Sequence, residues 1–227
     1  MKIAVLGTGT VGPTLAEKFA ALGHDVVIGT RDPEEAKNRM TSDREWVPPF
    51  GAWHQDHPDV DVATFSDATA DAELVVNATN GAASMDALKA AGSEHLDGKI
   101  LIEVANPLDF SQGMPPSLFV SNTDSLAEQI QAAFSGARVV KTLNTVTARL
   151  MVHPEETAGG DHTMFVAGND PDAKSQVTTI LTDWFGWKDV VDLGDLAGAR
   201  AMEMVLPLWL RLVMSSGNPM INVKVVR

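Results

Sequence analysis

The fold is decided by the stretch Lys2-Ile3-Ala4-Val5-Leu6-Gly7-Thr8-Gly9-Thr10-Val11-Gly12. Residues 2–6 are mostly apolar and are followed by glycine, which is typical of a strand buried on both faces of a parallel sheet. Gly7 permits a tight turn, Gly9 lets a pyrophosphate approach the backbone, and Gly12 lets the following helix pack closely. The stretch therefore predicts a strand, a phosphate-binding turn and a helix.

The helix is predicted directly after the turn. Apolar residues recur at steps of three or four from Val11 to Leu22, and Gly23 follows them. The N-terminal amides of such a helix, and roughly half a positive charge, face any anion bound at the turn. Residues 25–28 form a second apolar run. A glycine-rich motif alone also fits an ordinary loop, but this strand-turn-helix-strand context favours a dinucleotide site.

The end of the second predicted strand indicates which dinucleotide binds. In NAD-specific folds a carboxylate at this point accepts hydrogen bonds from the ribose 2'-hydroxyl and repels a 2'-phosphate. This chain has Thr30 and Arg31 instead, and a hydroxyl with a planar guanidinium can hold a phosphate. Arg31 can also be a solvated loop cation, and Asp32 can cap a helix that starts at Pro33. We expect NADP.

The composition excludes several kinds of chemistry. The 227 residues include 30 acidic and 17 basic side chains, for a net charge of -13, and no cysteine. Disulfides and thiolate sites are therefore excluded, and a chain this acidic repels nucleic acid and anionic membrane surfaces. No apolar run is long enough to span a bilayer. We expect a cytoplasmic protein with no nucleic-acid or membrane partner.

Strands and helices alternate along the first 145 residues, which predicts an α/β, doubly wound parallel sheet of the Rossmann, NAD(P)-binding type. Further strands are expected at 60–65, 73–78, 99–105 and 138–143, and helices at 33–40, 66–71, 84–92 and 125–134. Residues 41–59 contain Trp46, Trp53 and three prolines, which predicts an irregular loop or lid.

The composition changes after residue 146. Strands are expected at 163–167 and 189–193, with a helix at 171–185 between them. Residues 195–216 are apolar on nearly all sides, which indicates a long helix that is kinked at Pro207 and buried either in a core or between subunits. We expect an NADP-binding domain at 1–145. The C-terminal α/β extension at 146–227 would cover the cofactor crevice and supply a homodimer contact.

Small polar residues follow the predicted strands. In doubly wound sheets ligands bind outside the carboxyl ends of the strands, so the segments after these strands converge on one crevice. Neutral hydrogen-bonding groups there suit the carboxamide and ribose of a nicotinamide, although each residue is equally typical of an ordinary turn. The residues are Thr8, Thr30, Asn77, Thr79, Asn80, Asn106, Asn144 and Thr145.

No catalytic residue and no metal site can be assigned from the pattern. The chain has no tyrosine, so a proton donor would have to be Lys141 or one of His54, His57, His153 and His162. The pair in His54-Gln55-Asp56-His57 is favoured as solvated surface rather than as metal ligands. Lys141 ends a predicted strand, either beside the cofactor or as a plain strand-end cation.

Three segments resemble the coenzyme F420-dependent NADP reductases: residues 2–12, residues 27–31 and the tail at 206–224. Residues 106–108 and 141–144 are similar to relatives in the same broad group. The resemblance implies hydride transfer between NADP(H) and an 8-hydroxy-5-deazaflavin, coenzyme F420.

The resemblance also implies site residues. It implies that the pyrophosphate binds Thr8 to Gly12, that the 2'-phosphate binds Thr30 and Arg31, and that the nicotinamide lies near Asn77-Ala78-Thr79-Asn80 and Ala105-Asn106-Pro107. Two departures stand out. Glu35 occupies a position where family members can have a basic residue, so that Lys37 and Arg39 are the nearest cations, and the 41–59 insertion can reshape the second cofactor's site.

Two alternatives remain open. One is an NADPH-dependent reductase of another acceptor, such as an imine, a quinone or a ferric chelate. The other is a non-catalytic NADP(H) sensor, which we would favour if Trp46, Trp53 or Trp209 filled the space above the nicotinamide.

Overall fold

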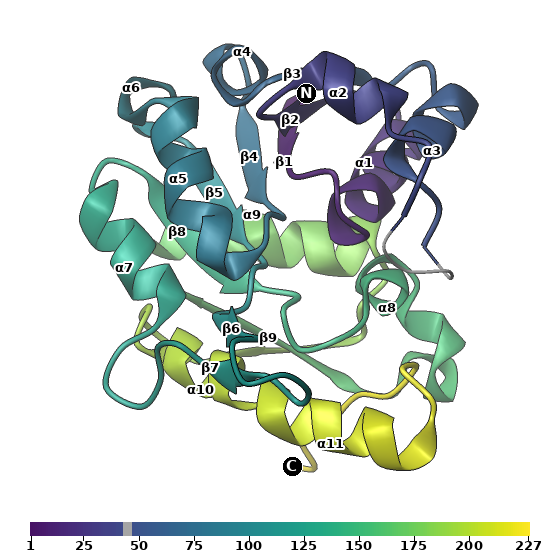
Figure 1. Cartoon of the computed structure of the whole chain (residues 1–227). Helices are drawn as coiled ribbons and strands as arrows, with labels where there is room; N and C mark the ends of the chain where they lie inside the picture. Colours follow the sequence, from purple (N-terminus) through teal and green to yellow (C-terminus); the bar gives the residue numbers. More distant parts are fainter. Residues whose placement is uncertain (43–46) are drawn as a thin grey trace.

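One large sheet organises the molecule. The computed structural model describes residues 1–42 and 47–227. Eight strands lie in the order β10-β9-β8-β5-β4-β1-β2-β3, with helices on both faces (Figure 1). The strands are β1 (Lys2–Leu6), β2 (Asp25–Thr30), β3 (Asp61–Thr64), β4 (Leu74–Asn77), β5 (Ile100–Glu103), β8 (Arg138–Thr142), β9 (Thr163–Gly168) and β10 (Asp189–Asp192). The expected doubly wound sheet is confirmed.

The helices divide between two hydrophobic cores. One core lies under α1 (Val11–Ala21), α2 (Pro33–Asn38), α3 (Phe50–Asp56), α8 (Ala148–Val152) and α9 (Pro171–Thr179), which a π-helical turn at Ile180–Trp184 continues. The other core lies under α4 (Phe65–Ala70), α5 (Gly81–Ala91), α6 (Ser93–Leu96), α7 (Leu126–Ala133) and α10 (Gly198–Met204). Short 3-10 turns occur at Pro154–Glu156 and Ala158–Gly160.

Alternation along β1 explains why its sequence is apolar throughout. Ile3 and Val5 point into the core under α1, whereas Ala4 and Leu6 point into the opposite core. All four side chains have no exposed surface. Since both faces of a central parallel strand are covered by helices, a continuous apolar run is what the position requires.

The strand order reverses beside β1. The chain runs from β1 to β2 and β3 on one side, and then crosses to β4 and continues outward on the other side. Leu6 at the end of β1 pairs in register with Gly29 of β2 and Asn77 of β4. A crevice outside the carboxyl ends of β1 and β4 is therefore the place where such a sheet binds its ligand.

The last third of the chain extends the same sheet. β9 pairs antiparallel with β8, and β10 pairs parallel with β9, so these two strands run opposite to the other six. The tail after α11 (Leu206–Ser216) crosses back over this edge, where the Thr163 amide donates to the Val223 carbonyl at 3.1 Å. In the part of the chain that the structure describes, no helix has the length and apolar character that crossing a bilayer requires.

The prediction of a single helix over 195–216 is wrong. Two helices, α10 and α11, meet at Val205, because Pro207 lacks an amide hydrogen and fits the first turn of α11. Leu206 is the one buried residue of α11, while Leu208 and Leu212 are 54% and 42% exposed. An apolar surface all round a helix thus does not by itself bury it in its own chain.

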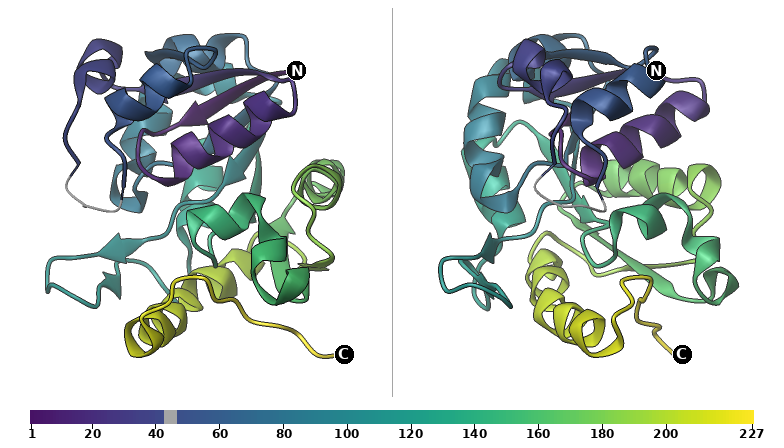
Figure 2. Two further views of the ribbon diagram at one scale, coloured as in Figure 1. Left: turned by 90° about the vertical axis from the view of Figure 1, so that its right-hand side faces the viewer. Right: turned by 45° about the vertical axis from the view of Figure 1, so that its right-hand side comes forward.

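The prediction of an irregular stretch over 41–59 is also wrong in part, since α3 occupies Phe50–Asp56. Pro49 precedes the helix, and Trp53 packs against the core under α1. Trp46 lies outside the described residues. A hairpin that the sequence did not predict, β6 (Leu108–Asp109) with β7 (Ser117–Leu118), projects from the body beside α11 (Figure 2).

Candidate functional site

The glycine-rich turn has the shape that phosphate binding needs. A Cβ at Gly12 would lie 2.0 Å from the carbonyl oxygen of Gly7, so the start of α1 packs directly on the turn. A Cβ at Gly9 would meet no atom within 4 Å, which leaves the backbone open on that side. No acidic residue occupies the first turn of α1, and no side chain caps its N-terminus. The amide groups of this helix are therefore available to an anion.

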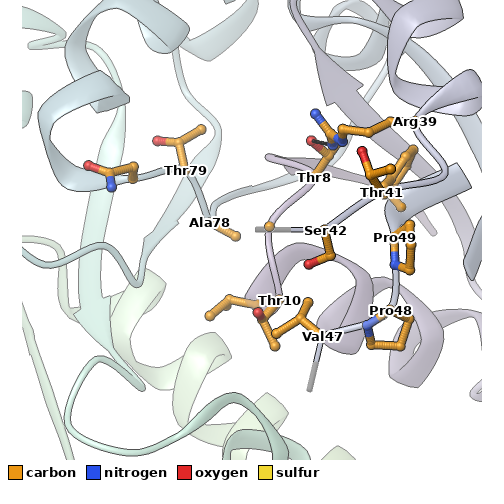
Figure 3. Close-up of a pocket in the computed structure, with 14 residues that line it drawn as sticks. Thr8, Thr10, Arg39, Thr41, Ser42, Val47, Pro48, Pro49, Ala78 and Thr79 are labelled. Atoms are coloured by element: carbon orange, nitrogen blue, oxygen red, sulfur yellow. Dashed lines mark hydrogen bonds between the residues drawn. The ribbon is translucent and has the colours of Figure 1, made fainter. Parts of the chain in front are cut away.

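A cavity of about 490 Å³ opens above the turn (Figure 3). Three segments line it: the turn itself, residues from 39–42 and 47–50, and the loop after β4. The lining residues are Thr8, Gly9, Thr10, Val11, Arg39, Thr41, Ser42, Val47, Pro48, Pro49, Phe50, Ala78, Thr79 and Asn80. The cavity thus lies at the switch point between β1 and β4, where the fold predicts a ligand.

Thr30 and Arg31 lie outside the lining of this cavity. Thr30 is buried at the end of β2, with 9% of its surface exposed. Arg31 is exposed and makes no hydrogen bond or ion pair with another described residue. A different cation borders the cavity: Arg39 donates from Nη2 to the Thr8 hydroxyl at 2.7 Å. The sequence pattern indicates Arg39 only as one of the two cations nearest Glu35.

The loop after β4 brings three of the predicted residues to the cavity, namely Ala78, Thr79 and Asn80. The fourth, Asn77, is fully buried and donates from Nδ2 to Ser84 and to Glu103. Its Oδ1 accepts from the Thr79 hydroxyl at 2.6 Å. Asn77 therefore supports the loop from beneath instead of lining the cavity.

The loop after β5 is tied to the loop after β8. The side chains of Asn106 and Asn144 are joined by a 2.9 Å hydrogen bond, and Asn106 also donates to the Asn144 carbonyl at 2.9 Å. The side-chain Nδ2 of Asn144 also donates to the Met202 carbonyl of α10 at 3.0 Å. Asn144 Oδ1 and Thr145 Oγ1 are buried and accept no hydrogen bond from a described residue. Neither Asn144 nor Thr145 lines the cavity above the turn.

A buried charge cluster lies under the Ala105 segment. Lys141 Nζ is 2.9 Å from Glu203 Oε1 and 3.8 Å from Glu103 Oε1, and all three side chains are buried. Lys141 also donates to the Ala105 carbonyl at 2.5 Å, while the Ala105 amide donates to Glu103 at 2.8 Å. Glu203 accepts from the Leu126 amide at 2.9 Å, at the start of α7. The cluster therefore fixes both polar groups of Ala105 and joins α10 to the sheet.

Of the two sequence interpretations of Lys141, the plain strand-end cation does not match this arrangement, because the side chain has no exposed surface. Lys141 does not line the cavity above the turn, and its partners are two carboxylates and a carbonyl. No sequence spacing could have paired Lys141 with Glu203, since they lie on β8 and α10.

Burial raises the pKa of Glu103 to about 7, although Lys141, Asn77 and the Ala105 amide all favour its charged form. A carboxyl whose pKa is higher in the folded state binds more protons there than when unfolded. Its contribution to stability is therefore greatest at low pH and declines as the pH rises from 4.5 to about 7.

The variant Glu103→Gln removes this titration while keeping the shape of the side chain. Between pH 4.5 and 7.5 we expect the wild type to lose on the order of 3 kcal/mol of unfolding free energy relative to the variant. Urea unfolding at a series of pH values measures the difference. Parallel curves for the two proteins would contradict the assignment.

The histidine candidates are all engaged elsewhere. His54 Nε2 lies 3.2 Å from the Val60 carbonyl, and His57 Nδ1 lies 2.8 Å from the Trp53 carbonyl of α3. His162 is buried between the Pro154 carbonyl and Asn222. His153 lies with Glu155 and Glu156 on an exposed turn. None of these four lines the cavity above the turn.

Comparison with known proteins gives a consistent result. Residues 2–107 match the family described as NADP oxidoreductase, coenzyme F420-dependent. The F420-dependent NADP reductase of Methanothermobacter thermautotrophicus is 31% identical over 216 residues, which are 93% of this chain and 89% of the relative. A crystal structure from Arthrobacter sp. FB24, provisionally named an F420-dependent NADP-reductase, is 57% identical over the full length of both chains, with a TM-score of 0.94.

More distant structures share the architecture. An imine reductase from Streptomyces aurantiacus covers 95% of this chain and 64% of its own, with a TM-score of 0.64 and 16% identity. Identity this low shows a common fold, and the function has to be argued from the site.

Proposed function

The chain belongs to the coenzyme F420-dependent NADP oxidoreductase family, and from that premise we propose that it transfers a hydride between NADP(H) and a deazaflavin, coenzyme F420. The observation that carries the proposal is the uncapped N-terminus of α1 beneath a glycine-rich turn that opens into a cavity. Such a turn suits a dinucleotide pyrophosphate.

The proposed cofactor contacts follow the crevice. Residues 8–12 hold the pyrophosphate, and Thr30 with Arg31 lies near the 2'-phosphate. Residues 77–80 and 105–107 border the nicotinamide. When bound, NADP(H) supplies or accepts the hydride. The chain's part is to hold donor and acceptor carbons close and aligned, which requires no general acid. That agrees with a cavity whose described lining contains no histidine, aspartate or glutamate.

The second cofactor has a candidate groove of about 500 Å³ between the β6–β7 hairpin and α11. The hairpin begins directly after Pro107, and α10, which precedes α11, is bonded to Asn144 through Met202. The groove therefore adjoins the proposed nicotinamide segment. Its lining is Pro115, Pro116, Ser117, Leu118, Ser121, Met204, Pro207 and Arg211.

The exposed apolar side of α11 supports a homodimer. Leu208, Leu212 and Met214 expose 42 to 54% of their surfaces, which is unusual for large apolar side chains on one short helix. We propose that a second copy covers them, that residues 146–227 act as the extension over the crevice, and that the enzyme works in the cytoplasm.

The double variant Leu208→Glu/Leu212→Glu tests the dimer. Because four carboxylates would be brought together at a twofold contact, we expect the variant to be monomeric at concentrations where the wild type is a dimer. Light scattering after gel filtration measures the masses. Unchanged mass would remove α11 from the interface, and Lys89→Glu on the exposed side of α5 serves as the charge control.

A screen of acceptors tests the function itself. The protein is mixed with NADPH or NADH and with oxidised F420, a quinone, a ferric chelate or a cyclic imine, and the absorbance of the nucleotide is followed. We expect rapid turnover with NADPH and F420. Turnover with another acceptor alone would indicate the other reductase, and tight NADPH binding without turnover would indicate a sensor. Among the tryptophans that would indicate a sensor, Trp53 and Trp209 do not line the cavity, and Trp46 lies outside the described residues.

A further inference from the structure

We propose that Arg39 is the cation that selects NADP(H), by binding the 2'-phosphate beside Thr8. This inference rests on the proposed function, because it concerns the same dinucleotide site. It assigns the specificity mainly to an arginine at the end of α2. Arg31, at the end of β2, would contribute less to binding of the 2'-phosphate.

The position of Arg39 supports the assignment. Its guanidinium reaches back to the glycine-rich turn and donates to the Thr8 hydroxyl at 2.7 Å, and both residues line the cavity (Figure 3). Thr8 directly follows Gly7, at the end of β1 next to β2. A phosphate beside these two groups would accept from a hydroxyl and from a planar fork of N–H donors, a geometry that suits a phosphate dianion.

The inserted helix α3 holds Arg39 in place. The Gly51 amide donates to the Arg39 carbonyl at 3.0 Å, and a Cβ at Gly51 would lie 2.4 Å from the Lys37 carbonyl oxygen. Only glycine allows α3 to approach the end of α2 this closely. The Phe50 ring lies 5.9 Å from the Arg39 guanidinium carbon, within reach of a cation–π contact. The insertion therefore anchors both the backbone and the head of this arginine.

Arg39 also offsets a local negative charge. A carboxylate oxygen of Glu35 lies 3.7 Å from Arg39 Nη1. A guanidinium has five N–H donors, so contacts to Thr8 and Glu35 leave donors for phosphate oxygens. The negative charge of Glu35 near the proposed phosphate site is thus paired with a cation that α3 supports.

Two fragments of the cofactor separate a 2'-phosphate contact from other contacts. Calorimetric titration with 2',5'-ADP and with 5'-ADP is compared for the wild type and Arg39→Ala. Loss of a charge-assisted contact is expected to weaken 2',5'-ADP binding about tenfold or more, with less than about a twofold change for 5'-ADP. Arg39→Lys keeps the charge without the fork and is expected to be intermediate.

Matched variants complete the experiment. Lys37→Ala removes a charge from the same helix, but Lys37 pairs with Glu34 and does not line the cavity, so its affinities should stay within about twofold of the wild type. Glu35→Gln should strengthen 2',5'-ADP binding a few-fold by removing a repulsive charge. Thermal melting of each ligand-free variant checks folding, and Arg39→Lys carries the comparison if Arg39→Ala melts early.

The outcomes are distinct. If Arg39→Ala weakened the binding of both fragments equally, Arg39 would contact the pyrophosphate and not the 2'-phosphate. If Arg39→Ala left both affinities unchanged and Arg31→Ala greatly weakened 2',5'-ADP binding, Arg31 would be the residue that binds the 2'-phosphate. Either result overturns the inference while wild-type turnover of NADPH with F420 leaves the proposed function standing. A wild type that binds neither NADPH nor 2',5'-ADP would instead refute the proposed function.

Discussion

Replacing Lys141 with methionine is expected to destabilise the protein by about 3 to 5 kcal/mol. The substitution leaves Glu103 and Glu203 without their cation, and both carboxylates are buried away from water. Total stabilities of natural domains are about 5 to 15 kcal/mol, so much of the margin would be lost. Urea unfolding at pH 8 measures the effect.

The pH dependence of this loss provides its control. Burial raises the pKa of Glu103 and Lys141 opposes this effect, so without the lysine Glu103 takes up a proton more readily in the folded state. Lowering the pH from 8 to 5 should therefore restore much of the lost stability of Lys141→Met. Lys89→Met removes an exposed lysine whose partner Asp86 is 3.7 Å away and should cost less than about 1 kcal/mol. A similarly small, pH-independent effect of Lys141→Met would refute the claim that Lys141 stabilises the buried carboxylates.

Replacing Gly12 with valine is expected to abolish NADPH binding and to lower the unfolding free energy by several kcal/mol. The first added carbon would already lie 2.0 Å from the Gly7 carbonyl oxygen, so that either the turn or the start of α1 must move. Off-rotamer and backbone shifts of this kind typically cost about 1 to 3 kcal/mol, and the branched side chain adds to them. Thermal melting and NADPH titration measure the two effects.

Gly9→Ala separates binding from folding. A Cβ at Gly9 meets no atom within 4 Å, so the melting temperature should be unchanged within experimental error. The same methyl group would stand where the pyrophosphate approaches the backbone, and NADPH affinity should fall at least about tenfold. If Gly9→Ala bound NADPH as well as the wild type, the turn would not be the pyrophosphate site.

Much of the fold could be predicted from local sequence. Continuous apolar runs such as residues 3–6 and 74–76 mark strands buried on both faces, and the glycine spacing of residues 7–12 fixes the strand-to-helix turn. These features depend on contacts between near neighbours. The switch point and therefore the position of the cavity follow from the order of such units.

Other features depend on contacts between distant residues. Glu203 and Lys141 form one cluster only because α10 folds back over the sheet, and no spacing in the sequence indicates this. The helix α3 was hidden by the prolines on both sides of it, and the fraction of α11 that would be buried cannot be read from its composition. Arg39 had one available signal, since it follows Glu35 by four residues on a predicted helix and could be expected to pair with it.

The site combines a general turn with features specific to this chain. Residues 8–12 and α1 would bind any dinucleotide, whereas the arginine that α3 supports is proposed to choose the phosphorylated one. The Glu103–Lys141–Glu203 cluster holds Ala105 by both its amide and its carbonyl, and so fixes one border of the proposed nicotinamide site.

Hydride transfer between the two cofactors is measured most directly by its stoichiometry. The protein is mixed with NADPH and oxidised F420 under anaerobic conditions, and the absorbances of both compounds are followed together, with Gly9→Ala as the negative control. We predict that both fall in equal molar amounts and that the control is at least about tenfold slower at limiting NADPH. A folded protein that binds NADPH and leaves the absorbance of the deazaflavin unchanged would contradict the proposed function.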